Sequence, residues 1–292
     1  MPVNVRYYTD PACPWSWGFE PKLRRLMWEF GDELRFTWVM GGLARSYGAG
    51  YHDAESGVGS GPDCFGDLMG QWLETAAESG MPIDARIWSQ NPIASTYPAC
   101  QAVKAAAEQG ERAAYRYLRR LREGLMAERT KLDHAEALIG EAGPAGLDTG
   151  RFRIDLSSNA ITEAFAADLD EVRDPPAEAR EQGKVSKTEG RDRVSFPSAL
   201  FRGEDRSEHG VWGWRPYEDY RDAALAAGAQ PARTQPPEPI EAIERFGRCA
   251  TRELEELTGK PNPVLQAELW GLARDWRLRP VGVPGGTFWE LP

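Results

Sequence analysis

The sequence predicts an α/β fold with a helical insertion and a small C-terminal α+β extension, and three observations indicate it. Residues 3–9 and 34–39 alternate apolar and polar side chains, which is typical of strands. A helical pattern lies between them, so the chain opens as a βαβ unit whose two strands are expected to be parallel. Residues 63–170 then turn to helical periodicity, and strand character returns at 198–202. We therefore expect a mixed sheet of four or five strands that is interrupted by a block of helices.

The helix that follows Cys13 is defined by an apolar stripe. Its members recur at spacings of four, three and four, which places them on one face: Phe19, Leu23, Leu26 and Phe30. Pro14 falls in the first turn, where a missing N–H costs nothing, whereas Pro21 falls inside the helix and is expected to kink it. Gly31 ends the helix. The pattern thus places Cys13 at a helix N-terminus, directly after a strand.

The main domain is predicted to span residues 1–228. A loop rich in glycine occupies 41–62, before the helical block. After the block, the strands predicted at 198–202 and 210–215 form a hairpin, and a helix over 216–227 closes the domain.

The C-terminal part is predicted to be a separate small subdomain. Residues 229–239 hold four prolines and predict a linker. Residues 240–292 read as helices followed by a β-hairpin, an order that resembles a winged helix. An apolar helical stripe indicates packing or dimerisation: Leu265, Leu269, Leu272 and Trp276. Glutamates offset the basic residues of this segment, which argues against DNA binding.

Composition excludes several classes of function. The chain has 292 residues and a formal net charge of -10, so it lacks the basic surface that nucleic-acid binding requires. It has no apolar run that approaches the ~20 residues of a membrane span, and no secretory signal is recognisable at its start. We therefore expect a cytoplasmic protein without nucleic-acid or membrane partners. Its four cysteines are expected to be reduced thiols, and their spacing matches neither a Cys-x-x-Cys pair nor a metal site.

Cys13 is the candidate reactive group. Free backbone N–H groups and the helix dipole stabilise a thiolate at a helix N-terminus, which predicts a pKa lowered from about 8.5 into the range of about 3.5–7.5. The alternative is a buried structural cysteine, which is common in protein cores. Cys64, Cys100 and Cys249 have no comparable context, so the structural interpretation is favoured for them.

Residues 7–18 (YYTDPACPWSWG) resemble the opening of DsbA-family oxidoreductases. They are most similar to the cytosolic relatives in that family, the FrnE-type proteins and the protease-adaptor branch. Kappa-class glutathione transferases and 2-hydroxychromene-2-carboxylate isomerases are more distant kin with the same fold. The resemblance covers roughly residues 3–228. It implies a thioredoxin-like fold whose helical insertion is the block at about 63–170.

The second mark of the family is a cis-proline that faces the thiol, and Ser195-Phe196-Pro197 matches it. A cis bond would turn the chain sharply and leave the preceding backbone groups free to pair with an extended substrate. An ordinary trans turn proline is the alternative. The predicted substrate-binding residues come from this segment and from the motif around the thiol: Pro14, Trp15, Trp17, Ser195, Phe196 and Pro197.

One departure from the family bears on function. Redox members have a second cysteine where this chain has Ser16, so Cys13 cannot close a disulfide within its own motif. The candidate catalytic residues are Cys13 and Ser16. Our first hypothesis is a monothiol oxidoreductase that acts through Cys13 by forming mixed disulfides. The second is a transferase or isomerase that uses a small thiol, with Ser16 or Cys13 steadying its thiolate, and the third is an adaptor protein without enzymatic activity.

The partners and cofactors follow from these hypotheses. We expect no tightly bound cofactor and no metal. A low-molecular-weight thiol such as glutathione, mycothiol or bacillithiol would serve the first two hypotheses, and a protein thiol is the other candidate substrate. A homodimer through the C-terminal part is a further expectation.

Overall fold

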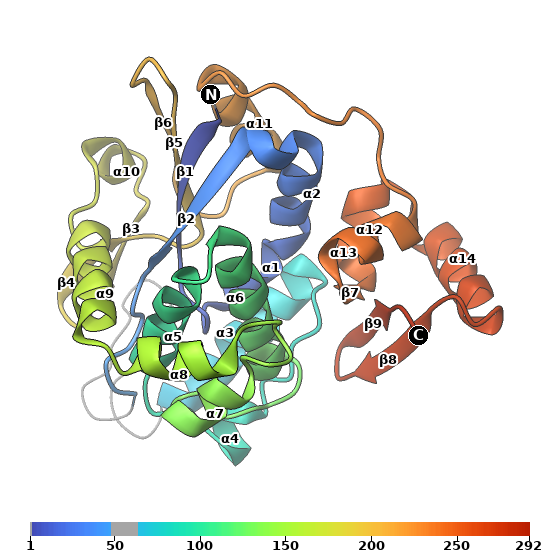
Figure 1. The fold of residues 1–292 in the computed structure, drawn as a ribbon, viewed down its shortest axis with the longest axis horizontal. Coiled ribbons are helices and arrows are strands. Elements are labelled where there is room, and N and C mark those ends of the chain that lie inside the picture. The colour runs from blue at the N-terminus through green and yellow to red at the C-terminus, as the bar shows by residue number, and fades with distance from the viewer. Residues whose placement is uncertain (1, 48–63) are drawn as a thin grey trace.

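A mixed four-stranded sheet lies at the centre of the fold, which the computed structural model describes for residues 2–47 and 64–292 (Figure 1). Its strand order is β2-β1-β5-β6. The strands are β1 (Val3–Thr9), β2 (Leu34–Met40), β5 (Ser198–Arg202) and β6 (Glu208–Val211). As predicted, β1 and β2 are parallel, while β5 pairs with β1 and with β6 in antiparallel fashion. Most of the predicted glycine-rich loop, residues 48–63, lies outside the described residues.

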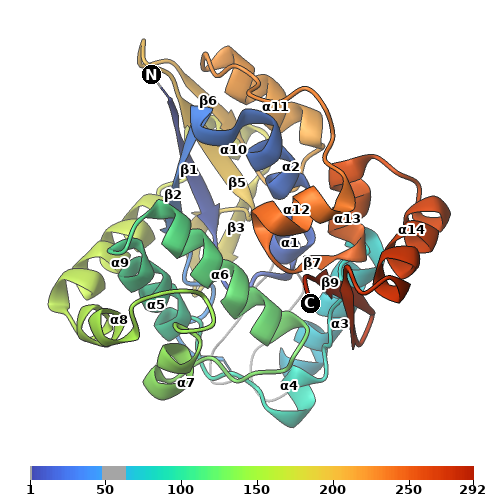
Figure 2. The same cartoon turned by 45° about the vertical axis from the view of Figure 1, so that its right-hand side comes forward.

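The helix after Cys13 is broken into two pieces. Helix α1 (Pro14–Gly18) ends at Phe19, and α2 (Glu20–Phe30) begins directly after it with Pro21 in its first turn. The predicted kink is therefore a break, because Pro21 starts a new helix, where its missing N–H costs nothing. Gly31 caps α2 in a positive-φ conformation, as expected. Helix α11 (Tyr217–Ala226) packs beside α2, with the Tyr220 and Phe19 ring centroids 4.5 Å apart (Figure 2).

The helical insertion is confirmed between β2 and the later strands. Its helices are α3 (Cys64–Ser79), α4 (Ile87–Gln90), α5 (Tyr97–Ala107), α6 (Glu111–Met126), α7 (Ala135–Gly140), α8 (Thr149–Leu156), α9 (Asn159–Val172) and α10 (Ala177–Glu181). Helices α5, α6 and α9 pack on β2, whereas α3 packs on α1 (Figure 1). The insertion therefore reaches the helix that carries the thiol motif.

Two features of the late strands differ from the sequence prediction. The strand expected at 210–215 is β6, which ends at Val211, because Gly213 adopts φ +76°, which strand residues do not. A hairpin that the sequence did not predict precedes β5. It pairs β3 (Val185–Thr188) with β4 (Arg191–Val194) in antiparallel fashion, outside the central sheet.

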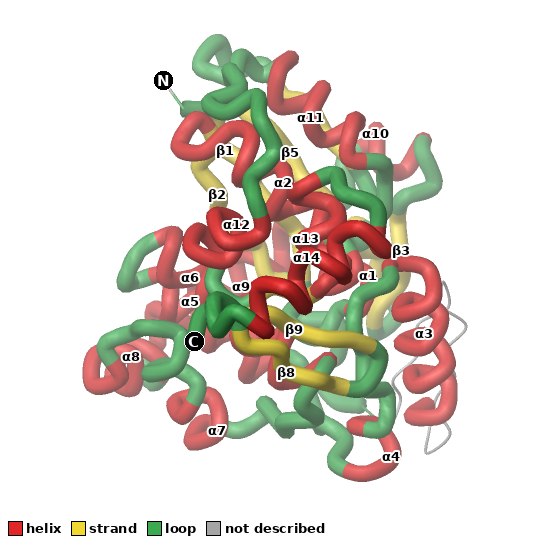
Figure 3. The backbone as a smooth tube through the Cα atoms, turned by 90° about the vertical axis from the view of Figure 1, so that its right-hand side faces the viewer, coloured by secondary structure: helices red, strands yellow, loops and turns green. Residues whose placement is uncertain are grey.

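The C-terminal segment contains three helices and a small sheet of its own (Figure 3). They are α12 (Pro239–Phe246), β7 (Cys249–Ala250), α13 (Thr251–Thr258), α14 (Asn262–Arg274), β8 (Arg279–Val283) and β9 (Gly286–Glu290). The predicted apolar stripe is buried at Leu265 and Leu269 but does not continue to Trp276, which lies beyond the helix end and is 87% exposed. The division into a linker at 229–239 and a subdomain at 240–292 stays a prediction.

The C-terminal segment meets the main domain through a buried ionic cluster at the junction of α2, α6 and α13. Arg119 of α6 donates to both carboxylate oxygens of Glu253 in α13, at 2.8 and 2.9 Å. Arg24 Nε of α2 lies 3.2 Å from Glu253 Oε1. Arg122 of α6 pairs with Glu20 of α2. Each of these five side chains is at most 6% exposed, so the cluster is shielded from water.

The arginines of the cluster favour the ionised form of Glu20. Burial opposes ionisation of Glu20, but the guanidinium groups of Arg122, Arg119 and Arg24 together hold the pKa of its carboxyl below the ordinary value. Glu253 also accepts a hydrogen bond from the Ala250 N–H at 2.7 Å, which fixes the start of α13. The cluster therefore ties three helices from distant parts of the sequence to one another.

Removal of one charge from the cluster is expected to destabilise the whole fold. The change Glu253→Gln leaves Arg24 and Arg119 without their shared carboxylate, which should lower the free energy of unfolding by about 3–5 kcal/mol. Urea unfolding followed by circular dichroism measures this change.

Glu256→Gln is the matched control in the same helix. Glu256 pairs with Arg25 and Arg252, whose side chains are 41% and 33% exposed, so loss of its charge should cost less than about 1 kcal/mol. Equal effects of the two changes would contradict the structural role of the cluster.

Candidate functional site

Cys13 lies in the turn between β1 and α1, and the buried carboxylate of Asp10 holds this turn in place. The Asp10 carboxylate accepts hydrogen bonds from the N–H groups of Ala12, at 2.8 Å, and Leu43, at 2.9 Å. The Cys13 N–H donates to the Asp10 carbonyl at 3.1 Å. Cys13 is the N-cap residue of α1, and its Sγ accepts a hydrogen bond from the Ser16 N–H at 3.4 Å. The predicted placement of the thiol at a helix N-terminus is therefore confirmed.

The electrostatic setting of the thiol differs from the prediction. Cys13 is 4% exposed, and this burial raises the pKa of its thiol above the ordinary value. Ser16 and Arg193 act in the opposite direction, and Asp10 adds to the rise. The expectation of a lowered pKa was wrong because removal of the thiol from water outweighs the stabilisation that the helix N-terminus supplies.

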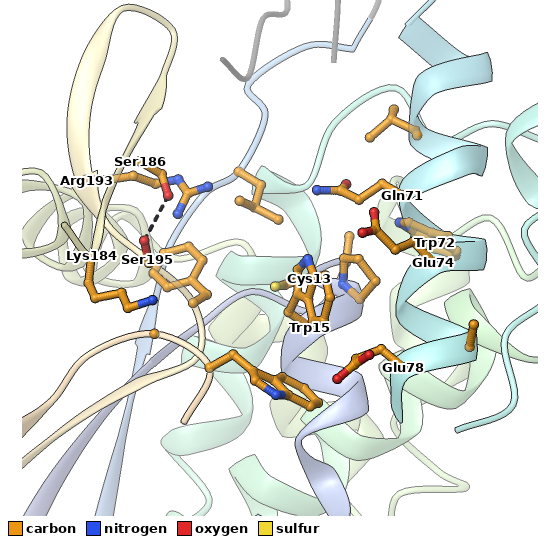
Figure 4. Close-up of a pocket in the computed structure, with 18 of the residues that line it drawn as sticks. Cys13, Trp15, Gln71, Trp72, Glu74, Glu78, Lys184, Ser186, Arg193 and Ser195 are labelled. Carbon is orange, nitrogen blue, oxygen red and sulfur yellow. Dashed lines mark hydrogen bonds between the residues drawn. The ribbon is translucent and has the colours of Figure 1, made fainter. Parts of the chain in front are cut away.

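A cavity of about 800 Å³ opens beside the thiol. As Figure 4 shows, Cys13 and Trp15 lie between helix α3 on one side and the β3–β4 hairpin on the other. Of the predicted site residues, the cavity brings together Cys13, Pro14, Trp15, Ser195 and Phe196. Trp15 meets Trp214 edge to face, with ring centroids 5.3 Å apart, which gives the cavity an aromatic side.

The other predicted site residues do not line the cavity. Trp17 is fully buried, donates from Nε1 to the Pro82 carbonyl at 2.9 Å and packs against Phe288 of the C-terminal segment. The expectation that Trp17 forms a wall for a substrate is therefore corrected, because its side chain lies in the core. Ser16 is buried next to the thiol, and its side chain favours the thiolate form of Cys13.

The peptide bond between Phe196 and Pro197 is cis, as predicted. At Ser195, two residues before the proline, the backbone is less open than we expected. The Ser195 N–H donates to the Lys184 carbonyl at 3.0 Å, and the Ser195 carbonyl accepts from the Ser198 hydroxyl at 2.6 Å. These bonds fix the loop against the β3–β4 hairpin, so Ser195 contributes its side chain to the cavity rather than a free backbone edge.

Several lining residues were missed at the sequence level. Lys184, Ser186 and Arg193 come from the unpredicted hairpin, which turns through Glu189 and Gly190 at positive φ. Alternating residues around that Glu-Gly pair were the available signal, but Glu-Gly is not among the usual hairpin turn pairs. Three polar residues of α3 also line the cavity: Gln71, Glu74 and Glu78. No sequence pattern associates this helix with the thiol.

Neither a metal-binding cluster nor a membrane-spanning helix occurs among the described residues. In residues 2–47 and 64–292, no group of three or more histidine, cysteine, aspartate or glutamate side chains could hold a metal ion. Within the same ranges, every helix is too short or too polar to cross a membrane.

Comparison with known proteins relates the chain to one family. A family model described as Thioredoxin matches residues 7–174. The chain is also similar to proteins named ClpXP adapter protein SpxH. It is 28% identical to that of Halalkalibacterium halodurans and 25% identical to that of Bacillus subtilis. Each alignment covers 99% of this chain and 89% of the relative, so the similarity includes the C-terminal segment.

A solved structure supports the same fold. The cytosolic disulfide reductase DsbM from Pseudomonas aeruginosa superimposes with a TM-score of 0.53 at 17% identity. The superposition covers 76% of this chain and 96% of DsbM. At this level of identity the likeness concerns the fold alone.

The raised pKa predicts slow, alkaline-shifted alkylation of Cys13. The pH midpoint of its reaction with iodoacetamide should lie above that of a free cysteine, because burial disfavours the thiolate. Peptide mass spectrometry of quenched samples follows Cys13 separately from the other three cysteines.

The change Ser16→Ala should move that midpoint further up, because the Ser16 side chain favours the thiolate. The midpoint, rather than the absolute rate, is the relevant quantity, since burial also limits access of the reagent. A midpoint below that of a free cysteine would show that the helix N-terminus dominates after all.

Proposed function

The chain belongs to the thioredoxin family, and we propose that it is a protein-binding adaptor of the ClpXP type, working in the cytoplasm. The observation that carries this proposal is the extent of the similarity to ClpXP adapter proteins, which runs over 99% of the chain. If the chain and these relatives shared only the thioredoxin fold, the alignments would not include the C-terminal segment. In this role the chain contacts ClpXP and a second protein, which we call the client.

The chemistry of the site supports binding over disulfide donation. A dithiol oxidase needs a second thiol beside the first, and Ser16 stands at that place. None of the four cysteines forms a disulfide, and all four are buried. Because burial also raises the pKa of Cys13, the thiol is largely protonated at neutral pH and is a poor nucleophile. The cavity beside it nevertheless offers aromatic, polar and charged groups that suit a protein segment.

The C-terminal segment supports the same proposal through its integration with the fold. Glu253 completes the buried ionic cluster, and Phe288 packs on Trp17, the residue directly after the Cys13–Ser16 motif. The segment contributes no residue to the lining of the cavity. The segment therefore packs against the residues next to the thiol motif without entering the cavity. In the proposed role, its solvent-exposed surface can bind a second partner.

Monothiol exchange is the second candidate function. The surroundings of Cys13 favour it because some of them stabilise the thiolate. The Ser16 N–H donates to Sγ at 3.4 Å, and the Ser16 side chain and Arg193 also favour the thiolate. A Cys13 thiolate that attacks the disulfide of oxidised glutathione, mycothiol or bacillithiol would form a mixed disulfide and release one reduced thiol. A protein disulfide could take the place of the small one.

Binding to ClpXP from the same organism distinguishes the two functions. Because an adaptor needs no covalent step, Cys13→Ser should bind ClpXP within about twofold of the unchanged chain, as measured by biolayer interferometry. Intact-mass analysis after incubation with oxidised glutathione should find most of the unchanged chain unmodified at neutral pH.

Absence of ClpXP binding, together with rapid formation of a Cys13 mixed disulfide, would contradict the adaptor proposal and favour monothiol exchange. The Cys13→Ser variant is the control for modification at the other cysteines.

A further inference from the structure

The cavity beside Cys13 carries opposite charges on its two sides. We infer that it selects a segment of the client protein by charge, with a basic side chain against α3 and an acidic side chain against the β3–β4 hairpin. This inference rests on the proposed adaptor function and specifies the chemistry of the client at the same site.

The carboxylate side is formed by Glu74 and Glu78. They are four residues apart on α3, so one face of the helix presents both toward the cavity (Figure 4). Both are exposed, and neither forms an ion pair with a described residue. Two neighbouring carboxylates repel each other, and a lysine or arginine side chain of a ligand would relieve that repulsion.

The cationic side is formed by Lys184 and Arg193. Lys184 is half-buried and forms no ion pair with a described residue. Arg193 is 6% exposed and is held in place by Thr188 Oγ1 at 2.7 Å and the Val194 carbonyl at 3.0 Å. Its guanidinium also lies over the Phe196 ring, 4.7 Å from the centroid. This side is therefore rigid at Arg193 and adaptable at Lys184.

An uncharged strip separates the two sides. Cys13 and Trp15 lie between them (Figure 4), Pro14 also lines the cavity, and Trp214 extends the aromatic surface. A ligand that meets both charged sides must therefore carry its basic and acidic groups on either side of a neutral or apolar centre.

The shape of the site favours a protein segment over a small zwitterion. The cavity of about 800 Å³ is at the large end of small-ligand sites. Its α3 side is open to solvent, since Glu74, Ala77 and Glu78 are all exposed. The ends of an extended chain can leave the cavity there, while the neutral centre rests on Trp15.

Peptides of controlled charge test the inference by NMR titration, which detects weak binding. The probes share a neutral centre and carry lysines at one end and glutamates at the other, lysines only, glutamates only, or no charge. The peptide with both charges should bind best. Glu74→Gln/Glu78→Gln should weaken its binding about threefold to tenfold, and Lys184→Gln about twofold to fivefold.

A charge reversal provides the sharper test. Lys184→Glu should turn the preference toward the lysine-only peptide, which an indirect structural effect would not do. The matched controls are Glu163→Gln/Asp170→Asn on α9 and Lys187→Gln on the hairpin, which change exposed charges that do not line the cavity. These controls should leave every affinity unchanged.

Two results would overturn the inference. One is equal binding of all peptides to the unchanged chain. The other is binding of S-methylglutathione, a small zwitterion that cannot form a disulfide, with no binding of the longer peptides. If ClpXP still binds in either case, the charge selection fails while the adaptor function stands. If the unchanged chain does not bind ClpXP, the proposed adaptor function itself is wrong.

Discussion

The buried ionic cluster at the junction of α2, α6 and α13 is the constraint on which the rest of the structure depends. Burial of arginines and glutamates is costly unless each charge is paired, and Glu253 supplies the carboxylate that both Arg24 and Arg119 require. The cluster therefore joins the C-terminal segment to the main domain, although most of the buried apolar residues of that segment form a core cluster of their own. Since α2 continues from the helix that carries Cys13, the same cluster also anchors the candidate site.

The site is assembled from segments that are far apart in the sequence. The motif at Cys13 supplies the thiol and Trp15, α3 supplies carboxylates, and the β3–β4 hairpin supplies cations. Separate hydrogen bonds hold two of these parts in place. Asp10 holds the turn before Cys13, and the Lys184 carbonyl holds the loop at Ser195. Such a composite surface suits recognition of another molecule, while the buried thiol at its base is poorly placed for rapid exchange.

The features that sequence analysis predicted are local ones. Alternation at 3–9, the stripe after Cys13 and the motif at Pro197 indicated the βαβ unit, the placement of the thiol and the cis bond, because nearby residues determine them. Tertiary packing brings the charges of α3 and of the hairpin to the cavity. The local sequence pattern of these elements does not indicate this placement. The pKa of Cys13 was predicted in the wrong direction for the same reason, since its burial depends on distant elements.

The most direct test of the account is made in the organism. Quantitative proteomics of a strain that lacks the chain should identify proteins that accumulate because ClpXP no longer receives them. At equal abundance of the two variants, we expect the Cys13→Ser variant to restore their normal levels and the charge-reversed Glu74→Lys/Glu78→Lys variant to leave them elevated. Restoration by the charge-reversed variant, together with failure of Cys13→Ser, would contradict an adaptor that binds through this cavity and would assign the function to the thiol.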